Sequence, residues 1–95
     1  MIGKRLKFAR LRADLSQTDL GIKAGMDKVT ANNRISAYEK KKYSTDKKTV
    51  ISLARALDVP TAYLWTEEDE LAELILQYHQ LKKFNPNNDI MLRPS

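Results

Sequence analysis

The amino-acid sequence predicts an all-α fold, and three observations support that prediction. Apolar residues recur at intervals of three and four through most of the chain, and no stretch alternates with the two-residue period of a strand. Residues that favour helix starts stand just before several of these apolar runs, at Ser16, Asp27, Asp46 and Pro60. The chain has 95 residues, of which 42% are hydrophobic and 31% charged, which suits one small globular domain.

The first two helices are predicted from spacing and capping. Residues 2–13 form the first helix, with its apolar positions at Ile2, Leu6, Ala9 and Ala13. Ser16 is expected to cap the second helix, in a capping box with Asp19 three residues later. Gly25 ends this helix, because glycine adopts the positive φ found at helix C-termini.

The remaining helices follow the same signals. Asp27 can cap a third helix that runs to about Glu39, Asp46 can cap a fourth, and Pro60 opens a short fifth over residues 61–65. Thr66 is expected to cap a sixth helix, whose acidic first turn suits the positive end of the helix dipole. The apolar stripe of this sixth helix is Leu71, Leu74, Ile75, Tyr78 and Leu81. Asn85-Pro86 ends it.

The charge of the chain is unevenly distributed. Residues 1–56 carry fourteen basic and five acidic side chains, a net charge of +9, whereas residues 57–95 carry three and seven, a net charge of −4. A basic body with an acidic end predicts a polyanionic partner for the first part and a different role for the second.

Several classes of protein are excluded by composition. The chain has no cysteine, so it has no disulfide framework, thiol nucleophile or thiolate metal site. His79 stands alone without a second metal ligand nearby, so we expect no metal and no cofactor. No run approaches the ~18 apolar residues of a membrane span, and no signal core follows Met1, so we expect a cytoplasmic protein without a membrane partner.

The second and third helices, joined at Gly25, have the layout of a helix-turn-helix. Such a unit needs a small residue where its two helices cross, and Gly21 occupies that position although glycine costs ~0.5–1 kcal/mol of helix stability relative to alanine. This local pattern leaves two readings open, a DNA-binding unit and a helical hairpin without DNA function.

A set of spaced motifs carries a family resemblance. The motifs are Leu15-Ser16-Gln17-Thr18-Asp19-Leu20-Gly21, then Gly25, then Ile35-Ser36-Ala37-Tyr38-Glu39-Lys40-Lys41-Lys42, then Asp46 and Leu53-Ala54-Arg55-Ala56-Leu57-Asp58-Val59. Over residues 2–65 the chain resembles the XRE-type helix-turn-helix family, the phage-repressor and Cro-like DNA-binding domains. The resemblance implies a compact five-helix, lambda-repressor-like domain that binds operator DNA, usually as a dimer.

The chain departs from the family pattern near the recognition helix. The segment from Gly25 to Ile35 is about one helical turn longer than usual, so either the recognition helix begins a turn earlier, at Asp27, or the preceding turn is enlarged. Lys41 stands where the family commonly has glycine, and Thr45 where it often has proline.

The resemblance and the side-chain chemistry together predict the site. Asparagine pairs with adenine, lysine and arginine pair with guanine, and lysines after the recognition helix neutralise phosphates without reading sequence. Gln17 is expected to contact a phosphate and brace the recognition helix. The predicted DNA-binding residues are Gln17, Lys28, Thr30, Asn32, Asn33, Arg34, Ser36, Lys40 and Lys42. In the family an arginine of the first helix pairs with the glutamate that ends the recognition helix, and Arg10 and Glu39 match those positions.

The sequence thus predicts a non-enzymatic transcriptional regulator, a repressor that binds double-stranded operator DNA as a homodimer. Residues 1–65 would form the DNA-binding domain, residues 66–84 a C-terminal helix for dimerisation or packing, and residues 85–95 a flexible tail. The alternative is an antitoxin or other interaction module whose C-terminal helix grips a partner protein. An enzyme is the remotest reading, because no nucleophile, base and orienting group cluster together.

Overall fold

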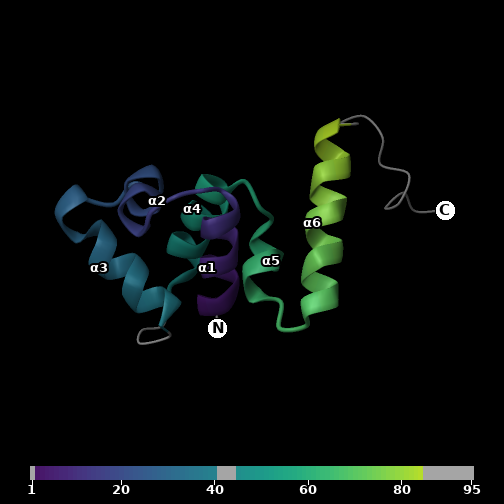
Figure 1. Cartoon of the computed structure of the whole chain (residues 1–95), viewed down its shortest axis with the longest axis horizontal. Helices are drawn as coiled ribbons and strands as arrows, with labels where there is room; N and C mark the ends of the chain where they lie inside the picture. Colours follow the sequence, from purple (N-terminus) through teal and green to yellow (C-terminus); the bar gives the residue numbers. More distant parts are fainter. Residues whose placement is uncertain (1, 41–44, 85–95) are drawn as a thin grey trace.

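The structure is a computed structural model that describes residues 2–40 and 45–84, and over these ranges it contains helices and no strand (Figure 1). The all-α prediction is therefore confirmed. The helices are α1 (Gly3–Arg12), α2 (Gln17–Lys23), α3 (Lys28–Glu39), α4 (Lys47–Leu57), α5 (Thr61–Trp65) and α6 (Asp69–Phe84). The tail predicted over residues 85–95, with the stop at Asn85-Pro86, lies outside the described residues.

Three of the helices begin at the residues that the sequence marked as caps. Ser16 Oγ accepts a hydrogen bond from the Asp19 amide at 3.0 Å, at the start of α2. The carboxylate of Asp27 accepts from the amide of the second residue of α3 at 3.1 Å, and that of Asp46 from the Thr49 amide at 2.9 Å. Each cap satisfies a backbone donor that the helix cannot pair internally, which fixes where the helix starts.

The crossing of α2 and α3 depends on Gly21. A Cβ placed there would lie 2.5 Å from the Cβ of Ala31 and 3.0 Å from its Cα, so only glycine lets the two helices approach this closely. Gly25 has a φ of +94°, which provides the sharp reversal between the helices.

The core is built mainly by the first five helices. Its largest fully buried side chains are Leu6, Leu20, Ile35, Val50, Leu53 and Leu64. α6 adds only Ala72 and Leu76 to this cluster. α1 ends at Arg12, so Ala13, predicted on the inner side of the first helix, lies at the C-cap and is exposed.

The sixth helix begins later than the sequence predicts. It begins at Asp69, and Thr66 does not cap it, because the Thr66 hydroxyl donates to the Ala62 carbonyl of α5 at 2.6 Å. The predicted apolar stripe is divided between core and surface, because Ile75 packs against the core and the stripe's leucines do not. Ala72 and Leu76 pack inward, whereas the stripe's three leucines are exposed: Leu71, Leu74 and Leu81.

A buried arginine explains the later start of α6. Arg5 of α1 donates to the carbonyl oxygens of Thr66 and Glu67 at 2.9 and 3.0 Å, and to Asp69 Oδ1 at 2.7 Å. These bonds hold the connection from α5 in an extended path, so the helix forms only after it. They also anchor α6 to α1.

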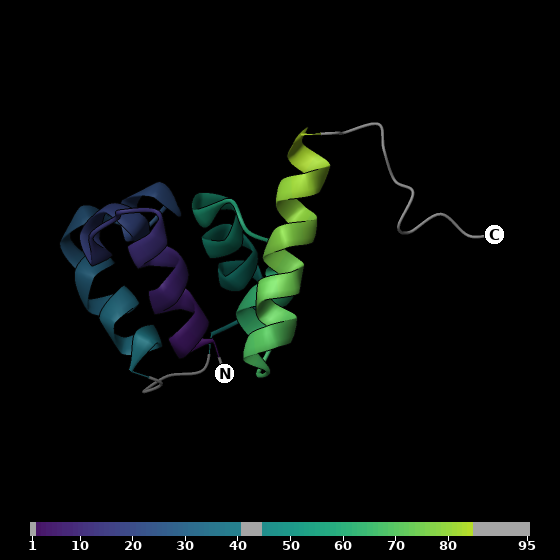
Figure 2. The same cartoon turned by 45° about the vertical axis from the view of Figure 1, so that its right-hand side comes forward.

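α3 and α6 lie at opposite ends of the domain. α3 lies on one side of α1, and α5 and α6 lie on the other, an arrangement visible from two directions (Figures 1 and 2). A surface on α3 and a surface on the outer side of α6 therefore do not overlap.

Candidate nucleic-acid interface

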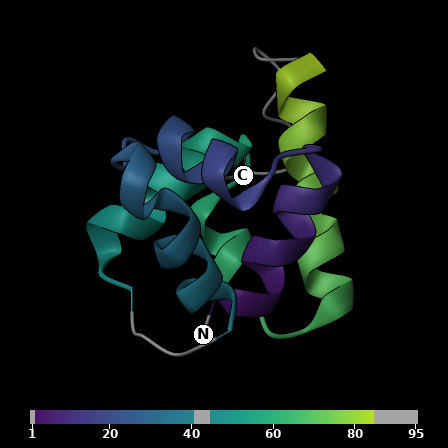
Figure 3. The ribbon, with the colours of Figure 1, turned by 60° about the vertical axis from the view of Figure 1, so that its left-hand side comes forward.

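The recognition helix is lengthened at its N-terminal end. α3 begins at Lys28 directly after its cap, Asp27, and runs twelve residues to Glu39. Of the two possibilities left open by the sequence, the structure has the longer helix rather than the larger turn. The additional turn carries Lys28 and Val29, which precede the crossing with α2 at Ala31. Figure 3 shows the domain with the side that carries α3 turned toward the viewer.

One strip of α3 lies beside the start of α2. It comprises Lys28, Asn32 and Ser36, which are four residues apart and therefore share a side of the helix. Lys28 and Asn32 are exposed, and Ser36 is half-buried. Asn32 Nδ2 donates to Gln17 Oε1 at 3.4 Å, which joins this strip to the first residue of α2.

The most exposed part of α3 contains Asn33 and an apolar side chain that sequence reasoning missed. Val29 precedes Asn33 by one turn and is 84% exposed. The sequence indicates that Val29 faces outward, because it is out of phase with the inward-facing Ala31 and Ile35. An exposed branched methyl group on a recognition helix is suited to contact the methyl group of thymine.

The other flank of α3 holds Thr30 and Arg34. Arg34 Nη2 donates to the Tyr38 hydroxyl at 3.0 Å, and its guanidinium lies 5.9 Å from the centre of that ring. Thr30 Oγ1 donates to the Asp27 carbonyl at 3.4 Å. Arg34 thus lies along its own helix, with the remaining donors of its guanidinium open to solvent.

A buried ion pair lies behind this surface. Arg10 Nε donates to Glu39 Oε2 at 2.6 Å, and Arg10 Nη2 donates to Glu39 Oε1 at 3.2 Å, so the two groups meet as a fork. The Arg10 side chain is 11% exposed and that of Glu39 is 5% exposed. Arg10 Nη1 also donates to the Leu15 carbonyl at 3.0 Å, which connects the end of α3 to α1 and to the α1–α2 connection.

Gln17 couples the ion pair to the exposed face. Its Nε2 donates to Glu39 Oε1 at 3.1 Å, while its Oε1 accepts from Asn32. A single amide therefore contacts both a buried carboxylate and an exposed asparagine. This geometry places Asn32 beside the first residue of α2 and links it to the buried ion pair.

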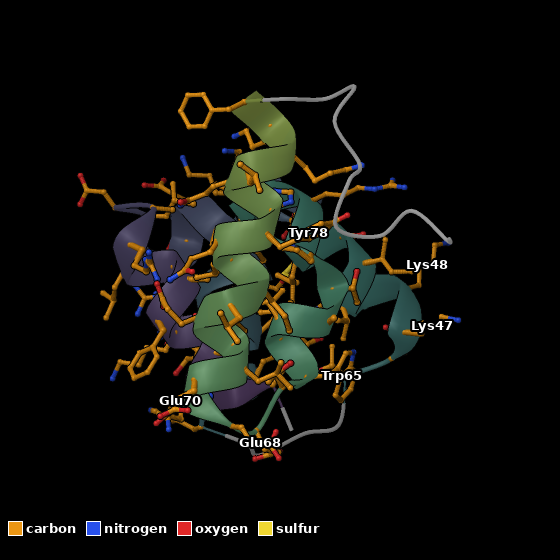
Figure 4. All side chains as sticks on the ribbon, turned by 90° about the vertical axis from the view of Figure 1, so that its right-hand side faces the viewer. Lys47, Lys48, Trp65, Glu68, Glu70 and Tyr78 are labelled. Carbon is orange, nitrogen blue, oxygen red and sulfur yellow. The ribbon has the colours of Figure 1, made fainter. Side chains whose placement is uncertain are left out.

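The lysines predicted to contact phosphate are distributed over two segments. Lys40 is exposed at the C-cap of α3, and Lys42 lies outside the described residues, as does Lys41. Lys47 and Lys48 open α4 and project into solvent (Figure 4). Hydrogen bonding with Thr49, first with its side chain and then with its backbone amide, lowers the pKa of Asp46 in this first turn below its ordinary value.

Residues 2–40 and 45–84 offer neither a metal site nor a membrane-spanning helix. This part of the chain contains no group of three or more His, Asp or Glu side chains placed to hold a metal ion. Nor does any helix described there have both the length and the apolar character that crossing a membrane requires.

Comparisons with known proteins agree with this geometry. A family model described as helix-turn-helix matches residues 6–64, which include α2, α3 and the residues of the buried ion pair. The crystal structure of the transcriptional regulator BswR is similar, with 43% sequence identity, coverage of 93% of this chain and 95% of that one, and a TM-score of 0.80. A search of curated proteins gave no match.

Proposed function

This chain belongs to the XRE-type helix-turn-helix family, and from this premise we propose that it is a sequence-specific repressor that binds operator DNA as a homodimer. DNA-binding regulation of transcription is the function that the family and its similarity to a transcriptional regulator support. The observation that carries the proposal is the exposed polar face of α3, held at a fixed angle by the buried Arg10–Glu39 pair.

The side chains of this face have the chemistry of base recognition. Asn32 and Asn33 suit adenine, which offers an acceptor at N7 and a donor at N6, and Lys28 suits the N7 and O6 acceptors of guanine. Val29 adds an apolar contact for thymine. Two adjacent asparagines are poor helix formers, so a reading role accounts for their presence better than helix stability does.

Phosphate contacts would supply most of the affinity. Residues 1–56 carry a net charge of +9, and Lys40, Lys47 and Lys48 are exposed near the ends of α3 and α4. Contact with about 6–10 phosphates per dimer would reduce affinity ~10³–10⁵-fold between 50 and 200 mM salt.

A dimer follows from the small footprint of one recognition helix. Dimers of this kind place two recognition helices in major grooves one helical turn, about 34–36 Å, or a multiple of it apart. Repression requires only that the operator be occupied, which a DNA-binding domain achieves by itself.

An antitoxin-like interaction module is the second candidate. The exposed leucines of α6 favour it, because exposed apolar patches usually mark contact surfaces. In that case α6 would bind a different protein, and the chain expressed in its own cell would co-purify with that protein.

Selection of binding sites from random DNA tests the proposal directly. Asn32→Ala and Asn33→Ala should each relax the preference at particular base pairs, with a loss of ~1–3 kcal/mol where a paired contact is removed. Lys40→Ala should instead weaken specific and random DNA alike and reduce the salt dependence by about one phosphate. Gln80→Ala, an exposed change on α6, is the matched control and should leave binding unchanged. If neither asparagine change alters the selected sequence, α3 does not read DNA as proposed.

A further inference from the structure

α6 is anchored to the rest of the domain near both of its ends. At its N-terminal end Asp69 accepts from Arg5 of α1 at 2.7 Å. At its C-terminal end Lys83 and His79 both bond to the carboxylate of Asp58, which follows α4 in a left-handed conformation. These two anchors hold the helix in place before any partner arrives, so little ordering is required when one binds.

The side of α6 that faces away from the domain is apolar. Ala72 and Leu76 occupy the inward side, and the outward side carries a row of larger residues at spacings of three, four and three. These are Leu71, Leu74, Tyr78 and Leu81, hereafter the α6 seam. The three leucines are 48%, 58% and 45% exposed, in the order of the sequence. Alternating spacings of three and four are the a and d positions of a coiled coil.

Figure 4 looks directly at this outward side, with α6 in front of the domain. Tyr78 and Trp65 project to the same flank of the helix, and Trp65 is also exposed. The charged residues Glu68 and Glu70 stand at the N-terminal end of α6. The seam thus has an apolar centre and an acidic end.

We propose that the α6 seam pairs with the α6 seam of a second copy of this chain, and that the two helices run antiparallel. The inference rests on the homodimer of the proposed function and specifies its contact surface. α3 lies at the opposite end of the domain, so this pairing leaves both recognition helices uncovered.

The charges along α6 determine the orientation. Glu68 and Glu70 flank the seam at one end, whereas Lys82 flanks it at the other. A parallel pair would bring like charges together, glutamates at one end and lysines at the other. An antiparallel pair brings the acidic end of each helix beside the basic end of its partner, and the two-fold symmetry of a homodimer repeats the favourable contact.

The antiparallel register also matches the apolar side chains. With the two-fold axis near the middle of the helix, Leu71 faces the partner's Leu81, and Leu74 faces the partner's Tyr78. In the same register Glu68 lies beside the partner's Lys82. Each leucine then meets an apolar side chain, and no charged group enters the seam.

The size of the seam predicts a weak dimer. α6 has sixteen residues and is therefore about 24 Å long, so the strip that it offers falls short of the ~800 Å² per partner typical of stable complexes. We therefore expect a dimer weaker than a standard-size complex. The dimer should therefore form and dissociate within concentrations that sedimentation can follow.

Sedimentation equilibrium of the full chain between about 5 and 500 μM tests the proposal without DNA. The wild-type chain should change from monomer to dimer, and Leu74→Glu should remain monomeric with unchanged helical circular dichroism, since Leu74 is outside the core. Leu81→Gln is a milder second variant and should raise the dissociation constant severalfold. Leu11→Glu is the matched control, because Leu11 is 56% exposed on α1 and lies off the seam.

Charge reversal tests the orientation. Glu68→Lys and Lys82→Glu should each weaken the dimer severalfold, and the double reversal should restore it. In a parallel pair the double reversal would restore nothing, because like charges would still meet.

Three results would overturn the proposal: a wild-type chain that stays monomeric throughout, a Leu74→Glu variant that dimerises like the wild type, or a double reversal that does not recover. A seam that serves a different protein or a lipid surface would give the first of these. Binding of each variant to a single half-site is measured separately, so a failure here is distinguishable from a failure of DNA recognition.

Discussion

Removal of Arg10 tests the buried ion pair behind the recognition helix. Arg10→Met deletes two hydrogen bonds to Glu39 and one to the Leu15 carbonyl. Glu39 would keep only the bond from Gln17 among those that hold it, while its carboxylate stays buried. Breaking a buried pair from one side costs ~3–5 kcal/mol, because the remaining charge is neither solvated nor paired. For a domain of this size that lowers the melting temperature by about 12–40 °C.

The matched control is on the same helix. Arg12 pairs with Glu73 at 3.4 Å, but both side chains are more than half exposed. Exposed pairs contribute at most ~1 kcal/mol, so Arg12→Met should lower the melting temperature by only a few degrees. The difference between the two arginines isolates the effect of burial from that of removing one positive charge.

A double mutant completes the test. Arg10→Met combined with Glu39→Leu removes both charges, and it should be more stable than Arg10→Met alone. Thermal melts followed by circular dichroism, with urea unfolding as a second measure, give the free energies of unfolding of the wild type, Arg10→Met, Glu39→Leu and the double variant. The reasoning is refuted if Arg10→Met stays within ~1 kcal/mol of the wild type, or if the losses of the two single variants simply add in the double variant.

Three further predictions concern packing, anchoring and pH. Gly21→Ala should lower the free energy of unfolding by ~1–2 kcal/mol, because the added Cβ would lie 2.5 Å from that of Ala31 and the cost of overpacking exceeds the gain in helix propensity. Urea unfolding measures this change, and an unchanged midpoint would contradict the prediction. Arg5→Met should increase hydrogen exchange in α6 more than in α2, and equal exchange would argue against the anchor. Lys83 and then His79 lower the pKa of Asp58 below its ordinary value, so this stabilisation is present above pH ~4 and is lost as pH falls through the folded pKa. Asp58→Asn, which tolerates the same left-handed backbone, should therefore lose less stability than the wild type on acidification, and parallel losses would count against the linkage.

The helices and their starts were predictable because their determinants are local. Ser16, Asp27 and Asp46 each bond to an amide two or three residues away, and Gly25 adopts its positive φ within its own turn. Gly21 was informative for a related reason, since glycine in a helix is unfavourable unless another helix requires the space. Signals of this kind are contained in a few consecutive residues.

The errors concern contacts between distant parts of the chain. Arg5 is in a basic stretch that resembles a solvated surface, yet it binds a segment more than sixty residues away and so delays the start of α6. α6 carries apolar residues on two sides, and both sides have helical spacing. Spacing alone left open whether the stripe packs on the domain or pairs with a partner, and in the structure Ala72, Ile75 and Leu76 are the side chains of α6 that contact the core.

For the site, sequence chemistry identified the polar face of α3 but not how its members are held. The link from Glu39 through Gln17 to Asn32 joins three helical positions that no spacing rule connects. Val29 was missed because the prediction selected polar and charged side chains for base contact and left apolar ones out. Base contact by these residues stays a prediction until binding is measured.

Because α6 lies at the far end of the domain from α3, the spacing between DNA half-sites depends on which surface joins the two copies. Two chains joined through α6 hold their recognition helices at the outer ends of the pair, whereas two chains joined through a surface nearer α3 would hold them close together. The first arrangement selects half-sites separated by more than one turn of the double helix, and the second selects half-sites separated by a single turn. The gap between half-sites recovered from random DNA therefore measures which part of the protein brings two copies together, without any structure of the complex.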